Sequence, residues 1–515
     1  MPAKAQATDR GSRYHRPTTP VRDERAPEFY REDVLLSLRH SAGRSRLDLG
    51  GDEQAAVPPA LRNLTYEYDW PELTAFAGIP GFMTFAYGCG LSDWLAGLPV
   101  NKRKSDYTVG KLCEVIIAGL AAGLARVSHV DDYRHDPGLC AALGLAQLPD
   151  QSTFSRFFAG LGEGAVRHLR EANQSFSRLS TMLKQRRRLL VVDSDTRVVG
   201  VYGKLEGSKR SRLNGGKPHF TFEITAVRNS HDIVDGGLLE GATHPAPLFQ
   251  SRFQTVLGQL AAQTDELIWC ADSAWYSAQI LETIEAADVN QSVPCTCHYV
   301  IRAKMTQRLR ECVAALPEAA WQACDEGMQM AECPFAFIET RGGKDLSPRR
   351  YIVTREWQQP KPAKGGQQVL VELPSYEYWA LVTNLNWRPQ RVRALYNDRV
   401  TIESILCEGA LGYHMDNLPS GSFVGNQVFC QLLIMAYNCM NLFRRLCLPQ
   451  QCRQHRVQGL RRMLLAIPGV VEYVGDRLTV HCSSAGPHVS LLPHLASRLR
   501  EWLAPPGIAA AASPG

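Results

Sequence analysis

Two short apolar runs of strand type each lead directly into an aspartate, and this pattern restricts the fold more than any other feature of the chain. Residues 189–192 precede Asp193-Ser-Asp195-Thr, and residues 267–271 precede Asp272-Ser. Runs of this length and composition predict β-strands bounded by turn residues. The pattern therefore places carboxylates at the exits of two predicted strands.

A third acidic motif is predicted to be helical. Tyr396, Arg399 and Glu403 are spaced by three and then four residues, so their side chains are expected to share one helix face. Carboxylates delivered by two strands and a helix suit a hard divalent cation such as Mg²⁺, which takes oxygen ligands and leaves room for substrate phosphates. The chemistry that this indicates is phosphodiester cleavage or transfer.

Composition narrows the class of protein. With 515 residues, 45% of them hydrophobic and 21% charged, the chain predicts a soluble globular protein of two to four domains. The N-terminus has no charged segment followed by an apolar one, which argues against secretion. The most apolar stretch, residues 115–124, is far shorter than the roughly 20 residues of a membrane span and predicts a buried helix.

The cysteines and the basic residues give further indications of the class of protein. The fifteen cysteines show no framework, which favours thiols over disulfides, and Cys295-Thr-Cys297-His298 lacks zinc-site spacing. The net charge of +6 is modest, but clusters of basic residues flank the acidic motifs, as expected if phosphates approach them. For any single cluster, a solvated helix face is the commoner explanation. The clusters are Lys184 to Arg188, Lys204 to Arg212, Arg388 to Arg393, and Arg444 to Arg462.

The segment before the acidic motifs is predicted to be helical. Residues 149–158 open a helix with Asp150 or Ser152 as a cap and aromatic residues on one side. Thr153, Ser155 and Arg156 at its start are compatible with contact to a DNA backbone, although an ordinary helical bundle would have the same pattern.

The predicted elements follow the order of a ribonuclease-H-like core: three strands, a helix, a strand, a helix and a strand. These are residues 189–192, 197–202, 218–227, 247–262, 267–271, 277–287 and 299–304. The helix bearing the last carboxylate, residues 391–410, comes some 85 residues later, which predicts a folded β-rich insertion with strands 350–354 and 368–372. An apolar helix at 428–444 and a hairpin of 470–474 with 477–481 are expected after it.

The fold class expected is therefore α/β: a ribonuclease-H-like catalytic core with a β-rich insertion, an N-terminal helical domain and a small C-terminal segment. The expected divisions are a flexible arm (1–60), a helical, DNA-binding domain (61–185), the first part of the core (186–304), the insertion (305–385), the second part of the core with the glutamate helix (386–450), and the C-terminal segment (451–515). Residues 509–515 are expected to fray.

Taken in order, the motifs resemble a known family. They are Asp-x-Asp followed by Tyr202-Gly203, Ala271-Asp272-Ser273, Val382-Thr-Asn-Leu385 before Tyr396-Asn-x-Arg399, Phe423-x-x-Asn426, residues 152–157, and Ile467-Pro-Gly469. Over roughly residues 110–485 the chain resembles a bacterial insertion-sequence DDE transposase with the Tyr-Arg-Glu signature, most like the thirteen-eighty family.

The resemblance implies a cut-and-paste recombinase that acts on the terminal inverted repeats of its own element. Asp195, Asp272 and Glu403 would be the catalytic acids and the ligands of two Mg²⁺ ions, with Mn²⁺ as a substitute. Tyr396, Arg399, Arg302 and Lys304 would contact DNA phosphates. The implied partners are double-stranded DNA, both repeats and target, and a second copy of the chain in a synaptic homodimer. The implied location is the bacterial cytoplasm, on the nucleoid, with no membrane partner.

Several alternatives stay open. Asp193 competes with Asp195 for the role of first acid, because the two lie on the same face of a strand. Arg399 could instead be a helical ion-pair partner of Glu403. Ala410 stands where the family branch often has a lysine or arginine. A transposase-derived protein that only binds DNA, and a nuclease without strand transfer, are the competing functions.

Overall fold

The computed structural model describes residues 65, 69–100, 106–182, 185–289, 294–325, 327–336, 348–358, 375–475, 477–485 and 488–503. The chain divides into Met1–Asp69 and Trp70–Gly515, and every described helix and strand belongs to the second unit. The expected arm at 1–60, the strand at 368–372 and the fraying tail at 509–515 lie outside the described residues.

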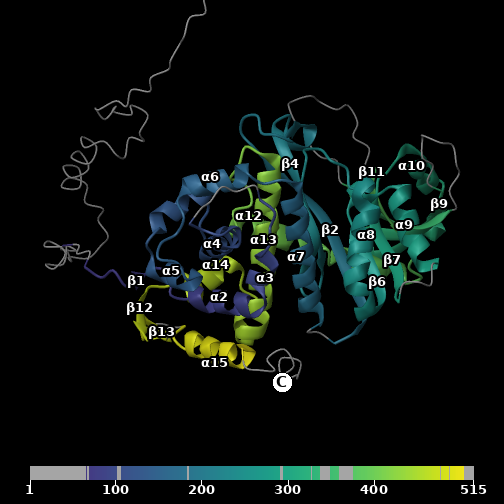
Figure 1. Cartoon of the computed structure of the whole chain (residues 1–515). Coiled ribbons are helices and arrows are strands. Elements are labelled where there is room, and N and C mark those ends of the chain that lie inside the picture. Colours follow the sequence, from purple (N-terminus) through teal and green to yellow (C-terminus); the bar gives the residue numbers. More distant parts are fainter. Residues whose placement is uncertain are drawn as a thin grey trace, which may run out of the picture. The chain divides into compact units, whose positions relative to one another are not determined.

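A mixed sheet organises the second unit (Figure 1). Its ten described strands run in the order β3-β4-β2-β6-β7-β11-β10-β9-β8, and β5 pairs with β4. The strands are β2 (Arg187–Gly200), β3 (Lys209–Arg210), β4 (Pro218–Val227), β5 (Ile233–Leu239), β6 (Thr264–Ala271), β7 (Thr296–Ala303), β8 (Gln322–Asp325), β9 (Met328–Phe335), β10 (Arg349–Gln358) and β11 (Ser375–Thr383).

Strand β2 corrects the expectation of two separate strands at 189–192 and 197–202. It is one strand of 14 residues. Its first half pairs with β6 in parallel and its second half pairs with β4 in the antiparallel sense, so the polar residues in its middle keep backbone partners on at least one side. Polar side chains do not end a strand whose ladder continues. Asp193 and Asp195 therefore lie within β2, whereas Asp272 does follow the end of β6 as expected.

Strand β5 was not predicted from the sequence, and it supplies the third member of the expected trio of consecutive strands. Asp235-Gly236-Gly237 interrupts its apolar pattern. Gly236 is required there because a Cβ would lie 2.7 Å from the Glu223 carbonyl oxygen of β4. The predicted helices at 247–262 and 277–287 are confirmed as α8 (Ala246–Leu260) and α9 (Ala278–Val289).

Strands β8–β11 continue the same sheet beyond β7, since β11 pairs with β7 and β10 lies between β11 and β9. The described part of segment 305–385 thus extends the sheet instead of building one of its own. The predicted strand at 350–354 lies within β10. Helix α10 (Gln307–Ala314) packs beside β9.

The predicted helix at 391–410 is two helices. It breaks at Asp398 and Arg399 into α11 (Pro389–Asn397) and α12 (Val400–Gly412). Tyr396 therefore belongs to the helix before the break and Glu403 to the first turn of the helix after it. The expectation that Tyr396, Arg399 and Glu403 share one face of a single continuous helix is therefore wrong.

Helices from both ends of the unit pack around α13 (Phe423–Cys447), which contains the predicted apolar helix and is buried along most of its length. The predicted hairpin is confirmed as β12 (Gly469–Val474) and β13 (Arg477–Cys482), and β12 also pairs with β1 (Leu73–Thr74). The other described α-helices, together with the short helix η3 (Val127–Tyr133), are α2 (Ile79–Gly88), α3 (Leu91–Leu95), α4 (Val109–Ala122), α5 (Pro137–Leu143), α6 (Gln151–Ala159), α7 (Glu163–Met182), α14 (Val457–Leu460) and α15 (Leu491–Leu503).

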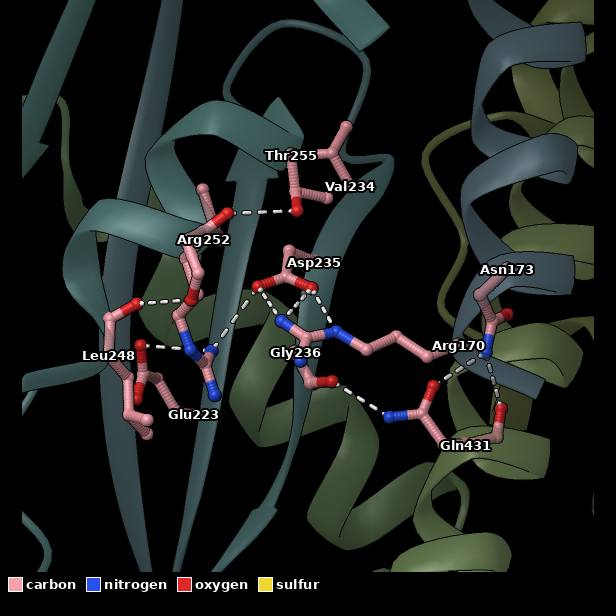
Figure 2. A network of polar contacts seen from close by, with 12 residues as sticks. Arg170, Asn173, Glu223, Val234, Asp235, Gly236, Leu248, Arg252, Thr255 and Gln431 are labelled. Carbon is pink, nitrogen blue, oxygen red and sulfur yellow. Dashed lines mark hydrogen bonds and ion pairs between the residues drawn. The ribbon is translucent and has the colours of Figure 1, made fainter. Parts of the chain in front are cut away.

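A buried polar network joins α7 and α13 to the sheet (Figure 2). The Asp235 carboxylate of β5 accepts hydrogen bonds at 2.7 to 2.9 Å from Arg170 of α7, and Arg252 of α8 lies 3.0 Å from Glu223 and 3.4 Å from Asp235. Gln431 of α13 donates to the Gly236 carbonyl at 2.8 Å. These contacts hold the helices in register with the sheet.

Within the described part of the chain, no single helix is long and apolar enough to cross a membrane. Helices α4 and η3, which are bent by 84° at their break, meet the length and composition test only as a pair.

Candidate carboxylate site

Asp195 and Asp272 lie at the same level of two neighbouring parallel strands. Ser194 of β2 pairs with Ala271, the last residue of β6, so the next residue on each strand is an aspartate. The Asp272 carboxylate caps the short helix η6 (Ser273–Trp275) by accepting a hydrogen bond of 2.8 Å from the backbone N–H of Ala274. The register of the sheet therefore brings together two acids that are 77 residues apart in the sequence.

Arg399 links Asp195 to the third acid. Its Nη2 lies 2.8 Å from Oδ2 of Asp195, and the same atom donates to the Ser194 carbonyl at 3.3 Å. Its Nη1 lies 3.9 Å from Oε1 of Glu403, one turn further along α12. Arg399 is buried, whereas the Glu403 side chain is 63% exposed. The break before α12 thus places an arginine between an acid on a strand and an acid on a helix.

The electrostatics of Asp195 reflect this grouping. The pKa of Asp195 is raised to about 6, mainly by burial and to a smaller extent by the negative charges of Asp272 and Glu403. Arg399 and the backbone N–H of Thr196 act in the opposite direction. Since both other acids influence this carboxyl group, the three predicted acids share one electrostatic environment.

Asp193 has a different environment. Its side chain is 1% exposed, and its two oxygens accept hydrogen bonds of 2.8 and 2.5 Å from Nε and Nη2 of Arg228. Nη1 of Arg228 donates to the Leu395 carbonyl of α11 at 2.5 Å. Both carboxylate oxygens of Asp193 are thus engaged inside the protein. Arg228 was missed in the sequence analysis, where its only signal is a lone arginine directly after the strand 218–227.

Of the four residues predicted to contact phosphate, three lie near the acids, and Lys304 does not join them by any described interaction. Burial raises the pKa of Tyr396, the positive charges of Arg399 and Arg302 lower it, and the charge of Asp272 raises it, so these four groups lie close together. Arg302 is exposed on β7. Lys304, after the end of β7, acts electrostatically on His244. Arg302 therefore belongs to the neighbourhood of the acids, and no described interaction joins Lys304 to it.

Ala410 is buried in α12, where a basic side chain would have no room beside the core. An arginine from elsewhere in the chain contacts the outer part of this helix: Nη2 of Arg456 donates to Oγ of Ser404 at 2.8 Å, next in sequence to Glu403. A cation thus lies beside the acidic helix although position 410 lacks one.

The three acids provide donor atoms of the type that a divalent cation requires. Two aspartates and an exposed glutamate offer the oxygen ligands that Mg²⁺ prefers. Among the described residues, no group of three or more His, Cys, Asp or Glu side chains is arranged closely enough to hold a metal ion. The Arg399 guanidinium lies between Asp195 and Glu403 and provides positive charge there. The donor types fit a divalent cation, and the arginine would have to give up at least one of its partners to it.

The fold and the site together define a class of protein: a mixed α/β protein that gathers acids from two adjacent strands and a following helix around a buried arginine. Residues 61–503 match the family model described as Transposase DDE domain group 1. Because the match spans most of the 515 residues, the chain belongs to this transposase family. Membership supports an enzyme of the polynucleotidyl-transferase type that acts on DNA, in a family that typically uses divalent metal ions.

None of the curated proteins matches the chain. A solved structure of piggyBac transposase in a synaptic complex with hairpin DNA is similar, with a TM-score of 0.41, 9% sequence identity and 82% of each chain covered.

Proposed function

We propose that this protein is an active transposase that binds the terminal inverted repeats of its own mobile element and moves the element by cut-and-paste DNA cleavage and strand transfer. The observation that carries the proposal is the grouping of Asp195, Asp272 and Glu403 around Arg399 in a chain of the DDE transposase family. The finer proposal, an insertion-sequence enzyme of the thirteen-eighty type with a Tyr-Arg-Glu signature, depends on the motifs in the sequence.

The strand order supports interpretation of the catalytic part as a ribonuclease-H-like core. Strands β5, β4 and β2 form an antiparallel meander, and β6 and β7 follow parallel to β2. In this proposal residues 186–304 and 386–450 form the core, residues 305–385 are an insertion that widens its sheet, and residues 61–185 contribute to DNA binding. In this proposal Glu403 follows the insertion in the sequence and still belongs to the same core as Asp195 and Asp272.

The proposed roles follow from the contacts. Asp195, Asp272 and Glu403 would hold two divalent ions, Mg²⁺ or Mn²⁺, which supply activation of a water or 3′-hydroxyl and stabilisation of the leaving oxygen. Without DNA, Arg399 partly neutralises the acids. When DNA is bound, its guanidinium can instead bind a phosphate near the scissile bond. Tyr396 and Arg302 orient that phosphate. Asp193 is assigned a structural role, because Arg228 occupies both of its oxygens.

The test is an assay of the full chain with the DNA ends that flank its own gene, with Mg²⁺ present. Wild type is expected to cut these ends and join them to target DNA, while Glu403→Gln binds them without cutting. Binding by both proteins without any cutting would support the DNA-binding alternative. Cutting without joining would support a nuclease, and equal cutting by both proteins would reject the assignment of Glu403. Size measurements with and without the ends test the proposed synaptic homodimer.

A further inference from the structure

The connection between β2 and β4, residues 201–217, carries an excess of positive charge; we call it the β2–β4 arm. It has five basic residues and one acid, Glu206. Lys209 pairs with Glu240. The other four cations are exposed, and within the described part of the chain none of them has an acidic side chain in ion-pair contact. These four are Lys204, Arg210, Arg212 and Lys217.

The arm is anchored to the body of the protein. Its acid, Glu206, accepts a hydrogen bond of 3.1 Å from the backbone N–H of Phe423, at the start of α13. The Gly207 carbonyl accepts from Gly241 at 3.2 Å, and Leu205 packs against the helical core. Within the arm, Arg210 donates to the Gly216 carbonyl at 3.3 Å. An anchored backbone displays the charges with less entropy to lose on binding than a free loop would have.

Helix α6 presents a second polar surface next to the arm. Its aromatic residues point inward, as predicted, and its exposed side carries no acid. Arg156 on that side is held by the hydroxyl groups of Ser152 and Thr153 at 3.3 and 3.2 Å, with no carboxylate partner among the described residues. The Asp150 carboxylate caps the helix by accepting a hydrogen bond of 2.7 Å from the backbone N–H of Thr153. The helix adds a cation and hydroxyl groups.

A groove of about 380 Å³ lies between α6 and the arm. Its lining includes Gln151 and Ser155 of α6, Gly200 at the end of β2, Tyr202 of the arm, and Arg126. The one acid in its lining, Asp416, is paired with Arg197 at 3.0 Å. Tyr202 is 98% exposed and Leu213 is 70% exposed. The groove is thus polar, and the one basic residue in its lining, Arg126, has no acidic ion-pair partner among the described residues.

The groove and the acids share strand β2. Gly200 lies five residues beyond Asp195, which corresponds to about 17 Å at about 3.3 Å per residue. This is roughly half of the 34 Å turn of a DNA duplex. A duplex with a phosphate at the acids can therefore reach the arm within one helical turn.

We infer that the β2–β4 arm and the exposed side of α6 bind the phosphate backbone of duplex DNA on one flank of the cleaved phosphate. The inference rests on the proposed function and adds to it the place and mode of contact. Lys and Arg side chains without internal partners bind phosphates by releasing counterions, and hydroxyl groups contribute backbone contacts that do not depend on sequence. Several exposed cations spread over one anchored segment favour a duplex, which carries many phosphates, over a small anion.

The experiment measures duplex binding by the full chain in EDTA, so that cleavage and metal binding play no part. The probe is a duplex of about 30 base pairs, three helical turns at about 10 base pairs each, of a sequence unrelated to the chain's own gene. The variant carries Lys204→Ala, Arg210→Ala, Arg212→Ala and Lys217→Ala. The matched control removes four exposed cations elsewhere, with Arg178→Ala, Arg308→Ala, Arg477→Ala and Arg500→Ala, so the change in net charge is the same.

The arm variant is expected to bind on the order of 10- to 100-fold more weakly at about 0.1 M salt. Its plot of log affinity against log salt should lose up to about 3.6 units of slope, since each of the four lost phosphate contacts removes about 0.9. The control should stay within about threefold of wild type. Equal loss in both variants would reduce the effect to net charge and overturn the inference. The same loss with single-stranded DNA or polyglutamate would overturn the duplex assignment.

Two further outcomes are informative. If wild type binds duplex DNA and the arm variant binds as tightly with the same salt slope, the inference fails while the proposed function stands. If wild type binds neither this duplex nor the DNA ends that flank its own gene, both fail. Should the fourfold variant unfold, Arg212→Glu alone, at an exposed position with no described partner, gives the same readout and is expected to weaken binding at least threefold.

Discussion

The guanidinium of Arg399 lies 2.8 Å from the carboxylate of Asp195, and both groups are largely buried. This pair is where the helix α12 meets the sheet, because Arg399 stands at the break between α11 and α12 and also contacts the Ser194 carbonyl of β2. One arginine therefore couples the position of the helix that carries Glu403 to the charge of the strand that carries Asp195. Variants compared at different pH values can separate the electrostatic role of Arg399 from the packing around it.

Replacing Asp195 should make the protein more stable without metal at neutral pH. Burial holds the pKa of Asp195 at about 6, above its ordinary value of 3.8, so folding favours the protonated form. Stability from this group is present below pH 4 and is lost as the pH rises to about 6. Asp195→Asn should raise the free energy of unfolding at pH 7 by up to about 3 kcal/mol, two pKa units at about 1.4 kcal/mol each.

Urea unfolding in EDTA at pH 4 and pH 7 measures this effect. The gain should vanish at pH 4, where the wild-type carboxyl group is already protonated. Glu403→Gln is the control, because its exposed side chain should change the free energy of unfolding by less than about 0.5 kcal/mol at either pH. A gain of equal size at both pH values would contradict the origin proposed for it.

Replacing Arg399 should have the opposite effect at neutral pH. Arg399→Ala removes the cation that lowers the pKa of Asp195, so the three acids face one another with less compensation. We expect a loss of about 1 to 3 kcal/mol in EDTA at pH 7 that becomes smaller at pH 5. The exposed Arg391, which stacks on Trp387, is the control: Arg391→Ala should cost less than about 1 kcal/mol. Thermal melts over this pH range provide the comparison, and a pH-independent loss would indicate packing instead.

Arg228 and Asp193 should behave as a structural pair. Arg228→Met leaves Asp193 buried without its partner and should cost about 3 to 5 kcal/mol, whereas the double variant with Asp193→Leu should recover much of this loss. The surface pair of Arg197 and Asp416 is the matched control, and Arg197→Ala should cost less than about 1 kcal/mol. A double-mutant cycle by urea unfolding measures the coupling, and additive losses would show that the two side chains act independently.

An assay of DNA cutting, combined with thermal melts, can distinguish the roles of Asp193 and Asp195. Asp195→Asn should abolish cutting while keeping the fold, by removal of a proposed metal ligand. Asp193→Asn should lower the melting temperature and retain measurable cutting at low temperature, because both oxygens of Asp193 accept hydrogen bonds from Arg228. The reverse pattern would make Asp193 the first acid.

The network of Figure 2 should control how α7 and α13 are attached to the sheet. Asp235→Asn removes the charge shared by Arg170 and Arg252 and should cost about 1 to 3 kcal/mol, because Arg170 loses its carboxylate partner whereas Arg252 keeps Glu223 at 3.0 Å. Gln431→Leu should cost about 1 to 3 kcal/mol through the unsatisfied Gly236 carbonyl. The protection of the β5 backbone amides against hydrogen exchange measures both effects locally. Unchanged protection there would contradict this role of the network.

The sequence by itself determined the elements whose signal is local. Apolar runs and turn residues located β4, β6, β12 and β13, and helical periodicity located α8, α9 and α13, because hydrophobic period and capping are properties of neighbouring residues. Asp272 was placed at a strand exit for the same reason. The candidate acids and Arg399 were also named from motifs alone.

Only the tertiary structure decided how these parts combine. Strand β2 continues through its acidic residues because β4 and β6 complete its ladder from both sides, and β5 forms although its centre reads Asp-Gly-Gly because Arg170 and Arg252 compensate Asp235. The motif favoured Asp195 over Asp193, but only the folded chain gives the two carboxylates their different partners, Arg399 for Asp195 and Arg228 for Asp193, each from a distant part of the sequence. Long-range pairing of backbone and charge leaves no periodic trace in the sequence, and for that reason it became visible only in the folded protein.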